Sequence, residues 1–278
     1  MSADGPQPER RTVVRAILGV AGTAAGLAVG GCTTGAGSQP GSPRTTTVPL
    51  PATQGSAVPS GTPPTSPQPA PGPPLSQPGP DIVSGPSTLG RVALTFHGAG
   101  DPALTAKVLD VARSAGAHLT VFAVGQWLAA NPSVGRDIVG AGHDLGNHTW
   151  SHQAMTHLTA SQAGREVQDG ARAVAAAVGS PGLLFRPSGT PTSTATIRAA
   201  ALAAGYQRCV SYDVDPEDYL DPGAELVRSR TLAAAKGGSI ISLHLGHAGT
   251  VEALPGILAG LAARGLSAVR LTELLSGA

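Results

Sequence analysis

Two histidines, His148 and His152, lie four residues apart in the stretch Gly-Asn-His-Thr-Trp-Ser-His. On one helical turn, side chains at this spacing point the same way, so both imidazoles could offer a neutral nitrogen to one divalent metal ion. The same pair could also be plain polar residues of the core or the surface. The positions of the other histidines favour the metal site.

Three further histidines follow apolar runs that are typical of buried strands. His97 follows residues 92–96, and both His244 and His247 follow residues 240–243. They are therefore expected at the ends of strands, where barrels and open α/β enzymes carry their reactive groups. The other three show no such placement and are expected to be ordinary surface or turn residues: His118, His143 and His157.

From about residue 89 onward, short apolar runs alternate with alanine-rich stretches typical of helices. Strands are expected over 92–96, 119–124, 143–146, 183–185, 209–212, 239–243 and 268–271. Helices are expected between them, for example over 103–114, 161–178, 193–204 and 251–263. Such alternation implies right-handed crossovers and a mostly parallel sheet, hence the α/β fold class. About seven such units indicate a single domain over 89–278, a small or incomplete (β/α) barrel.

The N-terminal 31 residues have the pattern of an export signal. Arg10 and Arg11 resemble a twin-arginine signal, and the uncharged stretch 16–29 is shorter than the roughly 18 to 20 apolar residues that cross a bilayer. The sequence Val-Gly-Gly-Cys at 29–32 resembles the cleavage box of bacterial lipoproteins, so Cys32 is expected to carry a lipid that attaches the protein to the membrane. The alternative is an incidental cysteine in a plain cleaved signal.

Residues 32–88 are expected to be a disordered tether. From residue 33 to 88 the chain holds 15 of its 25 prolines, and its only charged residues there are Arg44 and Asp81. A segment of this composition cannot bury a core and behaves as an extended spacer. It would hold the folded domain away from the membrane.

Charge and cysteine content exclude some classes of protein. The formal net charge of +1 gives no reason to expect a nucleic-acid partner. With only Cys32 and Cys209 in the chain, there is no disulfide framework, and Cys209 is expected to be a small core residue.

Across residues 89–278 the ordered motifs at the expected strand ends resemble the NodB-type polysaccharide deacetylases, carbohydrate esterase family 4. The family's second motif is matched by Gly-His-Asp-Leu-Gly-Asn-His-Thr-Trp-Ser-His at 142–152, and its third by Phe-Arg-Pro-Ser-Gly at 185–189. Asp-Pro-Glu-Asp-Tyr at 215–219 is similar to the fourth, with tyrosine in place of tryptophan, and Leu-His at 243–244 to the fifth. The resemblance implies a distorted (β/α) barrel whose divalent metal, often zinc, promotes removal of acetyl groups from sugars.

The resemblance also implies a role for each matching residue. His148 and His152 would be metal ligands, and Arg186 would orient the catalytic base. A backbone N–H near Gly189 would stabilise the oxyanion. His244 would be the general acid. Asp215 would orient and charge that histidine.

The first motif departs from the family. Where its members read Thr-Phe-Asp-Asp-Gly-Pro, this chain reads Thr-Phe-His-Gly-Ala-Gly-Asp-Pro at 95–102. The family's general base and third metal ligand are thus replaced by His97 and Gly98, and the nearest carboxylate is Asp101. We expect either His97 as base with Asp101 on the metal or the reverse assignment. Asp101 could instead only cap the helix that starts at Pro102, and His97 could be a loop residue without chemistry.

The expected function is metal-dependent deacetylation, with zinc as the metal, of an acetylated polysaccharide such as peptidoglycan at the outer face of the cell membrane. A monomer is expected. The altered first motif and Leu245, which replaces the family's aspartate after His244, motivate an alternative: a catalytically inactive barrel that binds carbohydrate as a tethered lipoprotein. A hydrolase of another amide or ester on the same scaffold is a third interpretation.

Overall fold

The computed structural model describes residues 78–276. The expected signal peptide, Cys32 and most of the tether lie outside the described residues. Within 78–276, no helix is long and apolar enough to cross a membrane.

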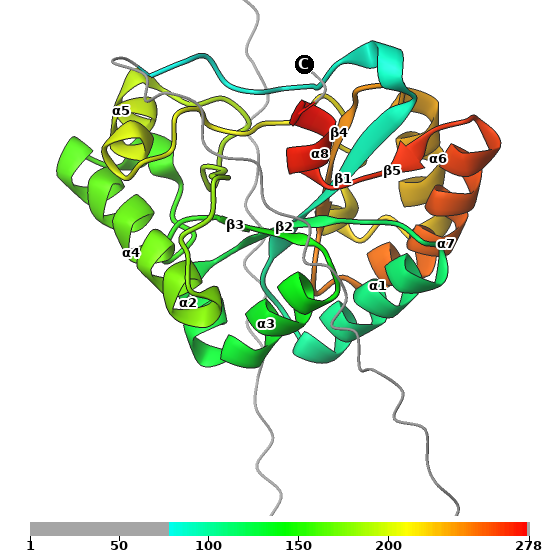
Figure 1. Ribbon diagram of the computed structural model, residues 1–278, viewed down its shortest axis with the longest axis horizontal. Helices are drawn as coiled ribbons and strands as arrows, with labels where there is room; N and C mark the ends of the chain where they lie inside the picture. The colour runs from blue at the N-terminus through cyan, green and yellow to red at the C-terminus, as the bar shows by residue number, and fades with distance from the viewer. Residues whose placement is uncertain (1–77, 277–278) are drawn as a thin grey trace, which may run out of the picture. The chain divides into compact units, whose positions relative to one another are not determined.

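A parallel sheet forms the centre of the domain (Figure 1). Its strands are β1 (Arg91–Gly98), β2 (Thr120–Ala123), β3 (Asp144–Asn147), β4 (Ile240–His244) and β5 (Ser267–Ala268). The order is β3-β2-β1-β4, and β5 pairs with the start of β1. Because parallel strands end at the same edge of a sheet, the C-terminal residues of β1, β3 and β4 meet there.

The barrel is incomplete. Two of the expected strands, 183–185 and 209–212, contribute only single bridges, Asn147 with Phe185 and Ile82 with Val210. The last expected strand, 268–271, is shorter than predicted, because β5 ends at Ala268 and a helix begins at Leu271.

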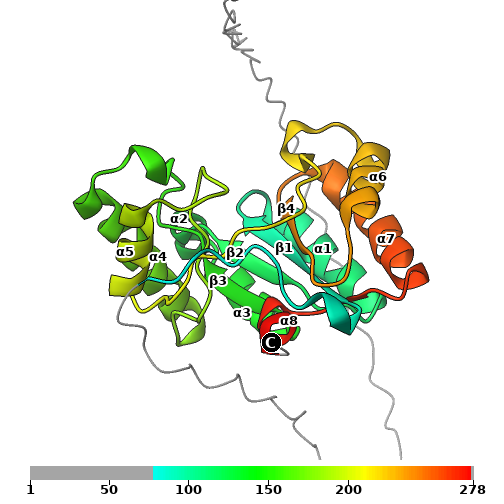
Figure 2. The ribbon, with the colours of Figure 1, turned by 90° about the horizontal axis from the view of Figure 1, so that it is seen from above.

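Helices cover the sheet on both sides (Figure 2). They are α1 (Pro102–Ser114), α2 (Gly125–Ala130), α3 (Pro132–Gly140), α4 (Ala160–Val178), α5 (Ala195–Ala203), α6 (Ala224–Ala234), α7 (Ala248–Ala263) and α8 (Leu271–Ser276), with short 3₁₀ turns η1 (Ser87–Leu89), η2 (Met155–His157) and η3 (Asp218–Leu220). Local sequence sets their ends: α4 begins with a reciprocal capping box between Thr159 and Gln162 and ends at Gly179 in the left-handed conformation.

The apolar strand interiors form the core. Leu94, Phe96, Val121 and Leu243 are fully buried, and α1 and α7 pack against the same cluster. The strands are therefore anchored by burial, which fixes the positions of the side chains at their ends.

The folded domain begins before residue 89. Ile82 N–H donates to the Cys209 carbonyl at 2.8 Å, Gly85 N–H donates to the Gly238 carbonyl at 2.8 Å, and the Asp81 carboxylate accepts from Ser193. The C-terminal end of the expected tether is thus attached to the domain.

His143 differs from the sequence expectation because it is buried, with 5% of its surface exposed. Its Nδ1 accepts a hydrogen bond from Leu119 N–H at 3.1 Å, and its Nε2 has no partner in the part of the chain that the structure describes. Burial, followed by the charge of His118, lowers the pKa of His143 to about 4.

This burial predicts acid sensitivity. Between pH 6.5 and about 4 the unfolded chain binds a proton at residue 143 that the folded chain does not, so the free energy of unfolding falls as the pH drops through this window. The contribution is about 3 kcal/mol at most. We expect His143→Gln to flatten this part of the stability curve, measured by urea unfolding at pH 7.5, 6, 5 and 4. Parallel curves for the two proteins would contradict the prediction.

Candidate metal centre

Three histidines from separate parts of the sheet edge come together. His97 at the end of β1, His148 directly after β3 and His152 in the following loop place ligand atoms within 4.8 Å of one another. The ring centroids are 4.5 Å apart for His97 and His148 and 4.9 Å apart for His148 and His152. The sequence predicted the last two as a pair and left the third ligand open between Asp101 and His97; in the structure it is His97 that lies with the pair.

His148 is oriented as a metal ligand requires. Its ring is fully buried, and Nδ1 donates a hydrogen bond to the Arg186 carbonyl at 2.8 Å. A proton held at Nδ1 leaves Nε2 with a free lone pair, and Nε2 is buried without a partner among the described residues. A buried nitrogen without a partner is costly unless a ligand occupies its lone pair, so the residues present fit a metal ion.

The surroundings of all three imidazoles lower their pKa values and so favour the neutral form at neutral pH. Burial lowers the pKa of His97 well below its usual value, and the charges of His148 and Arg186 lower it further. The pKa of His148 is also lowered, first by burial and then by His152. Burial lowers the pKa of His152, and His244 adds to the effect. Neutral imidazole is the form that binds a metal.

The loop that carries His152 is not helical, contrary to the prediction of one helical turn. Thr149 and His152 both adopt left-handed backbone conformations, with φ of 68° and 60°. Non-glycine residues are uncommon there and need support from their surroundings. The two histidines therefore converge through a tight loop.

Glu166 of α4 supplies that support. Its buried carboxylate accepts hydrogen bonds from the N–H groups of Trp150 and Ser151, at 3.0 and 2.8 Å, and from the Ser151 hydroxyl at 2.6 Å. Sequence reasoning missed this residue, because a glutamate inside an amphipathic helix gives no local signal that it is buried.

Asp101 lies outside the histidine group. Its carboxylate accepts a hydrogen bond from Ala103 N–H at 2.8 Å, which caps α1. The loop before it is fixed by Trp127, whose indole N–H donates to the Gly100 carbonyl at 2.7 Å. In the structure Asp101 is therefore the N-cap residue of α1.

Gly98 has no room for a side chain. A Cβ atom there would lie 2.9 Å from the Val121 side chain and 3.0 Å from the Ala123 backbone. Val121 and Ala123 belong to the packed core, so a carboxylate at position 98 would point into apolar packing.

His244 is paired with Asp218 and not with Asp215, the residue that the family resemblance implied for this role. The Nδ1 atom of His244 donates to Asp218 Oδ1 at 2.7 Å. The other Asp218 oxygen accepts from the His244 backbone N–H at 2.8 Å and from the Thr250 hydroxyl at 2.7 Å. Asp218 is 1% exposed. The physical reason is the 3₁₀ turn η3, which directs residue 218 toward the end of β4.

Asp215 instead is exposed and accepts a hydrogen bond from Glu217 N–H at 2.9 Å. Burial raises the pKa of Tyr212, and the charge of Asp215 raises it further. Asp215 therefore influences the site from its margin.

The register of the sheet brings His244 to the histidine group. His97 pairs with His244 across β1 and β4, and their ring centroids are 4.3 Å apart. The Ser242 hydroxyl lies 3.1 Å from His97 Nε2. A histidine with a buried carboxylate partner thus lies beside the candidate metal ligands.

Arg186 is 1% exposed, and its guanidinium lies over the rings of Phe122 and Tyr212. One terminal nitrogen donates to the Ser211 carbonyl at 2.9 Å, while Nε and the other terminal nitrogen are buried without partners among the described residues. Within residues 78–276 no carboxylate forms an ion pair with it. Burial lowers its pKa to about 9, so it remains a cation at neutral pH.

Gly189 requires its glycine. Its φ is 67°, and a Cβ would lie 2.7 Å from the Ala154 Cα atom. The preceding Ser188 hydroxyl lies 3.0 Å from that of Thr149 and donates to the Gln153 carbonyl at 2.6 Å. The loop at 186–189 is thereby joined to the loop that carries His152.

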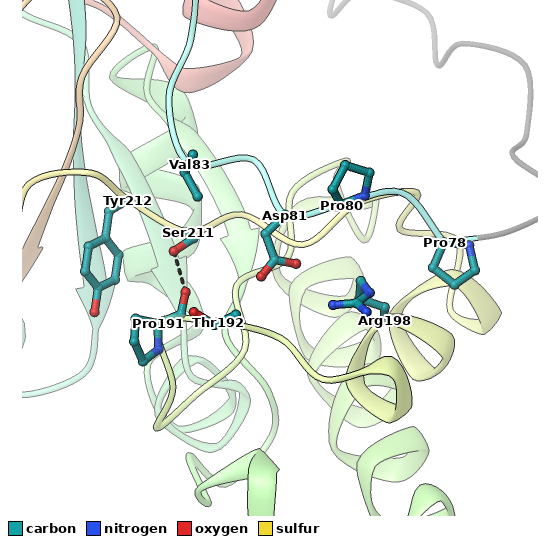
Figure 3. Close-up of a pocket in the computed structure, with 9 residues that line it drawn as sticks. All are labelled: Pro78, Pro80, Asp81, Val83, Pro191, Thr192, Arg198, Ser211 and Tyr212. Carbon is teal, nitrogen blue, oxygen red and sulfur yellow. Dashed lines mark hydrogen bonds between the residues drawn. The ribbon is translucent and has the colours of Figure 1, made fainter.

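A surface hollow of about 520 Å³ lies next to Tyr212 (Figure 3). Its walls combine Pro191 and Thr192, which follow the Gly189 loop, with Asp81 and Arg198. The Tyr212 ring is also 6.5 Å from that of His97, so this residue connects the hollow with the histidine group.

The chain is similar to known polysaccharide deacetylases. The family model described as polysaccharide deacetylase matches residues 85–209. Over 188 residues the chain is 35% identical to the peptidoglycan-N-acetylglucosamine deacetylase of Bacillus cereus, covering 66% of this chain and 87% of that protein.

Several solved structures are similar to the chain. The family 4 carbohydrate esterase from Streptomyces lividans in complex with acetate matches with a TM-score of 0.60 and 32% identity, covering 65% of this chain and 92% of that one. A mutant of a CE4 family pseudoenzyme with restored enzymatic activity, whose wild type is from Bacillus anthracis, matches with a TM-score of 0.66 and 25% identity, covering 70% of each chain.

The geometry predicts which side chains retain a metal ion. After loading with Zn²⁺ and gel filtration, the full chain should hold about one ion, since three neutral imidazoles are a sufficient protein ligand set. His97→Ala and His148→Ala should each lose it, measured by elemental analysis. Asp101→Ala is the matched control, expected to keep the metal while losing about 1 kcal/mol of stability with its helix cap. Metal loss in Asp101→Ala together with retention in His97→Ala would contradict the assignment.

Proposed function

Because the chain belongs to the polysaccharide deacetylase family, which includes deacetylases of N-acetyl sugars, we propose that it is a metal-dependent enzyme that removes acetyl groups from N-acetyl sugars of a cell-surface polysaccharide. The observation that carries this proposal is the group of three neutral histidines beside the paired His244 and Asp218. This arrangement offers both a metal site and a proton-transfer group at one edge of the sheet.

The metal ligands in this proposal are His97, His148 and His152, with zinc as the ion. A divalent ion held by three imidazoles would polarise the acetyl carbonyl and lower the pKa of water in the site. The ligand set carries no negative charge, unlike an aspartate-containing set. The assignment with Asp101 as the ligand is less well supported, because its carboxylate caps α1.

His244 is the proton-transfer group. Asp218 accepts from its Nδ1 and so leaves Nε2 for the reaction. Because His97 serves as a metal ligand in this proposal, the His244 imidazole carries out both proton transfers. It takes the proton of the attacking water and returns it to the nitrogen of the leaving amine. The buried Asp218 stabilises the imidazolium that exists between the two transfers.

Charge that develops on the acetyl oxygen requires donors at fixed positions. The Gly189 backbone N–H makes no hydrogen bond within residues 78–276, and the positive φ of this glycine fixes its orientation. Arg186 adds a buried cation close enough to lower the pKa of His97. Both groups are positioned before the reaction, which is the condition under which such stabilisation is largest.

The substrate and location follow from the relatives. The similar Bacillus cereus protein acts on peptidoglycan N-acetylglucosamine, as its name states, so we propose peptidoglycan or a chitin-like glycan as the substrate here. We further propose that the protein is exported and acylated at Cys32, with the proline-rich segment as a spacer between the lipid and the catalytic domain. These last features rest on the sequence pattern.

A second candidate function is a catalytically silent barrel that binds glycan. It is favoured by the missing carboxylate at position 98, where the packing against Val121 and Ala123 leaves no space for one.

Acetate release from a chitin oligosaccharide by the zinc-loaded full chain tests the proposal. His244→Ala should lower kcat by about 10²- to 10⁴-fold because it removes the proton-transfer group. Asp218→Asn should also lower kcat, since it removes the charge that stabilises the imidazolium, while metal content stays unchanged. An unmodified chain that binds the oligosaccharide but releases no acetate would replace the enzyme with the glycan-binding alternative.

A further inference from the structure

A second histidine–aspartate pair lies beside the first. His247 donates through Nδ1 to Asp221 Oδ1 at 2.9 Å, and its ring centroid is 6.0 Å from that of His244. His247 lies three residues after His244, and Asp221 lies three residues after Asp218. Nothing in the proton-transfer scheme uses this second pair.

The backbone on both sides of the pair is constrained. Asp221 adopts φ of 49°, directly after η3, in the left-handed region that non-glycine residues seldom occupy. On the other side, Gly246 has φ of 91°, and a Cβ there would lie 3.0 Å from the Gly100 Cα atom. Conformations of this kind persist where the surroundings determine them, and they cluster at ligand sites.

The His247 imidazole is open to solvent on its remaining nitrogen. Its side chain is 27% exposed, compared with 21% for His244. With Nδ1 bound to Asp221, only Nε2 is left, and it has no hydrogen-bond partner within residues 78–276. The ring is thus anchored at one nitrogen and presents the other to a ligand.

The turn that leads to Asp221 also carries exposed apolar side chains. Tyr219 is 44% exposed, and its ring centroid lies 5.2 Å from that of His244, on the same turn that leads to Asp221. Leu220 is 61% exposed. Exposed apolar side chains on the turn that also holds the partner of a fixed polar atom are a combination suited to a molecule with both CH faces and hydroxyl groups.

We propose that His247, held by Asp221, is a specificity-determining residue whose Nε2 forms a hydrogen bond with a hydroxyl group of the glycan next to the acetyl group being removed. The inference rests on the proposed function for its substrate class. It assigns the second pair to substrate binding and leaves both proton transfers to His244.

The test compares binding and turnover of a chitin tetrasaccharide in the zinc-loaded full chain. Loss of one hydrogen bond predicts that His247→Ala raises both Kd, by calorimetry, and KM by about 3- to 10-fold, with kcat nearly unchanged. Asp221→Ala should do the same. Asp221→Asn should restore most of the affinity, because the amide oxygen still accepts from Nδ1.

Two controls make the result specific. His118→Ala removes an exposed histidine just before β2, at the opposite end of the strands, and should leave Kd unchanged. A small aryl acetate, which lacks the sugar hydroxyls, should be hydrolysed equally by the unmodified chain and by His247→Ala.

Unchanged tetrasaccharide Kd and KM in His247→Ala would overturn the inference, as would a fall in kcat with Kd unchanged. If the unmodified chain binds the tetrasaccharide without releasing acetate, the proposed function fails, and the Kd series alone then decides whether His247 binds glycan.

Discussion

The in-register pairing of β1 with β4 is the constraint on which the rest of the site depends. It places His97 and His244 on the same rung, with ring centroids 4.3 Å apart, while the fully buried residues before them prevent the strands from sliding. A one-residue shift would turn His97 into the core and bring Gly98 to the site. The loop after β3 then completes the site by adding His148 and His152.

The electrostatic character of the site follows from the same arrangement. The two family aspartates of the first motif are replaced by His97 and Gly98, so neither the histidine group nor Arg186 has a carboxylate ion-pair partner within residues 78–276. The nearest fully buried carboxylate, Asp218, is engaged by His244 and Thr250. The centre therefore combines neutral ligands with a buried cation, which favours an anionic transition state over a neutral ground state.

The sequence predicted the alternation of strands and helices, the open barrel and the family, because apolar periodicity and motif order are local signals. It also predicted His148 and His152 as partners. It did not predict which carboxylate contacts His244, since that depends on the left-handed turns around η3, nor the role of Glu166, which becomes clear only when α4 packs against the loop. The sequence left Asp101 open between a role in the site and a helix cap. The hydrogen bond from Ala103 N–H to its carboxylate, and the contact of Trp127 with the preceding Gly100, show that it caps α1.

The proposed metal centre is built from three imidazoles without a carboxylate. X-ray absorption at the zinc edge of the loaded full chain tests it most directly, because imidazole nitrogens give a characteristic outer-shell scattering pattern. We expect three imidazole ligands, with zinc–nitrogen distances of about 2.0 to 2.1 Å. Two imidazoles with a protein carboxylate, or zinc bound without ordered imidazoles, would contradict it.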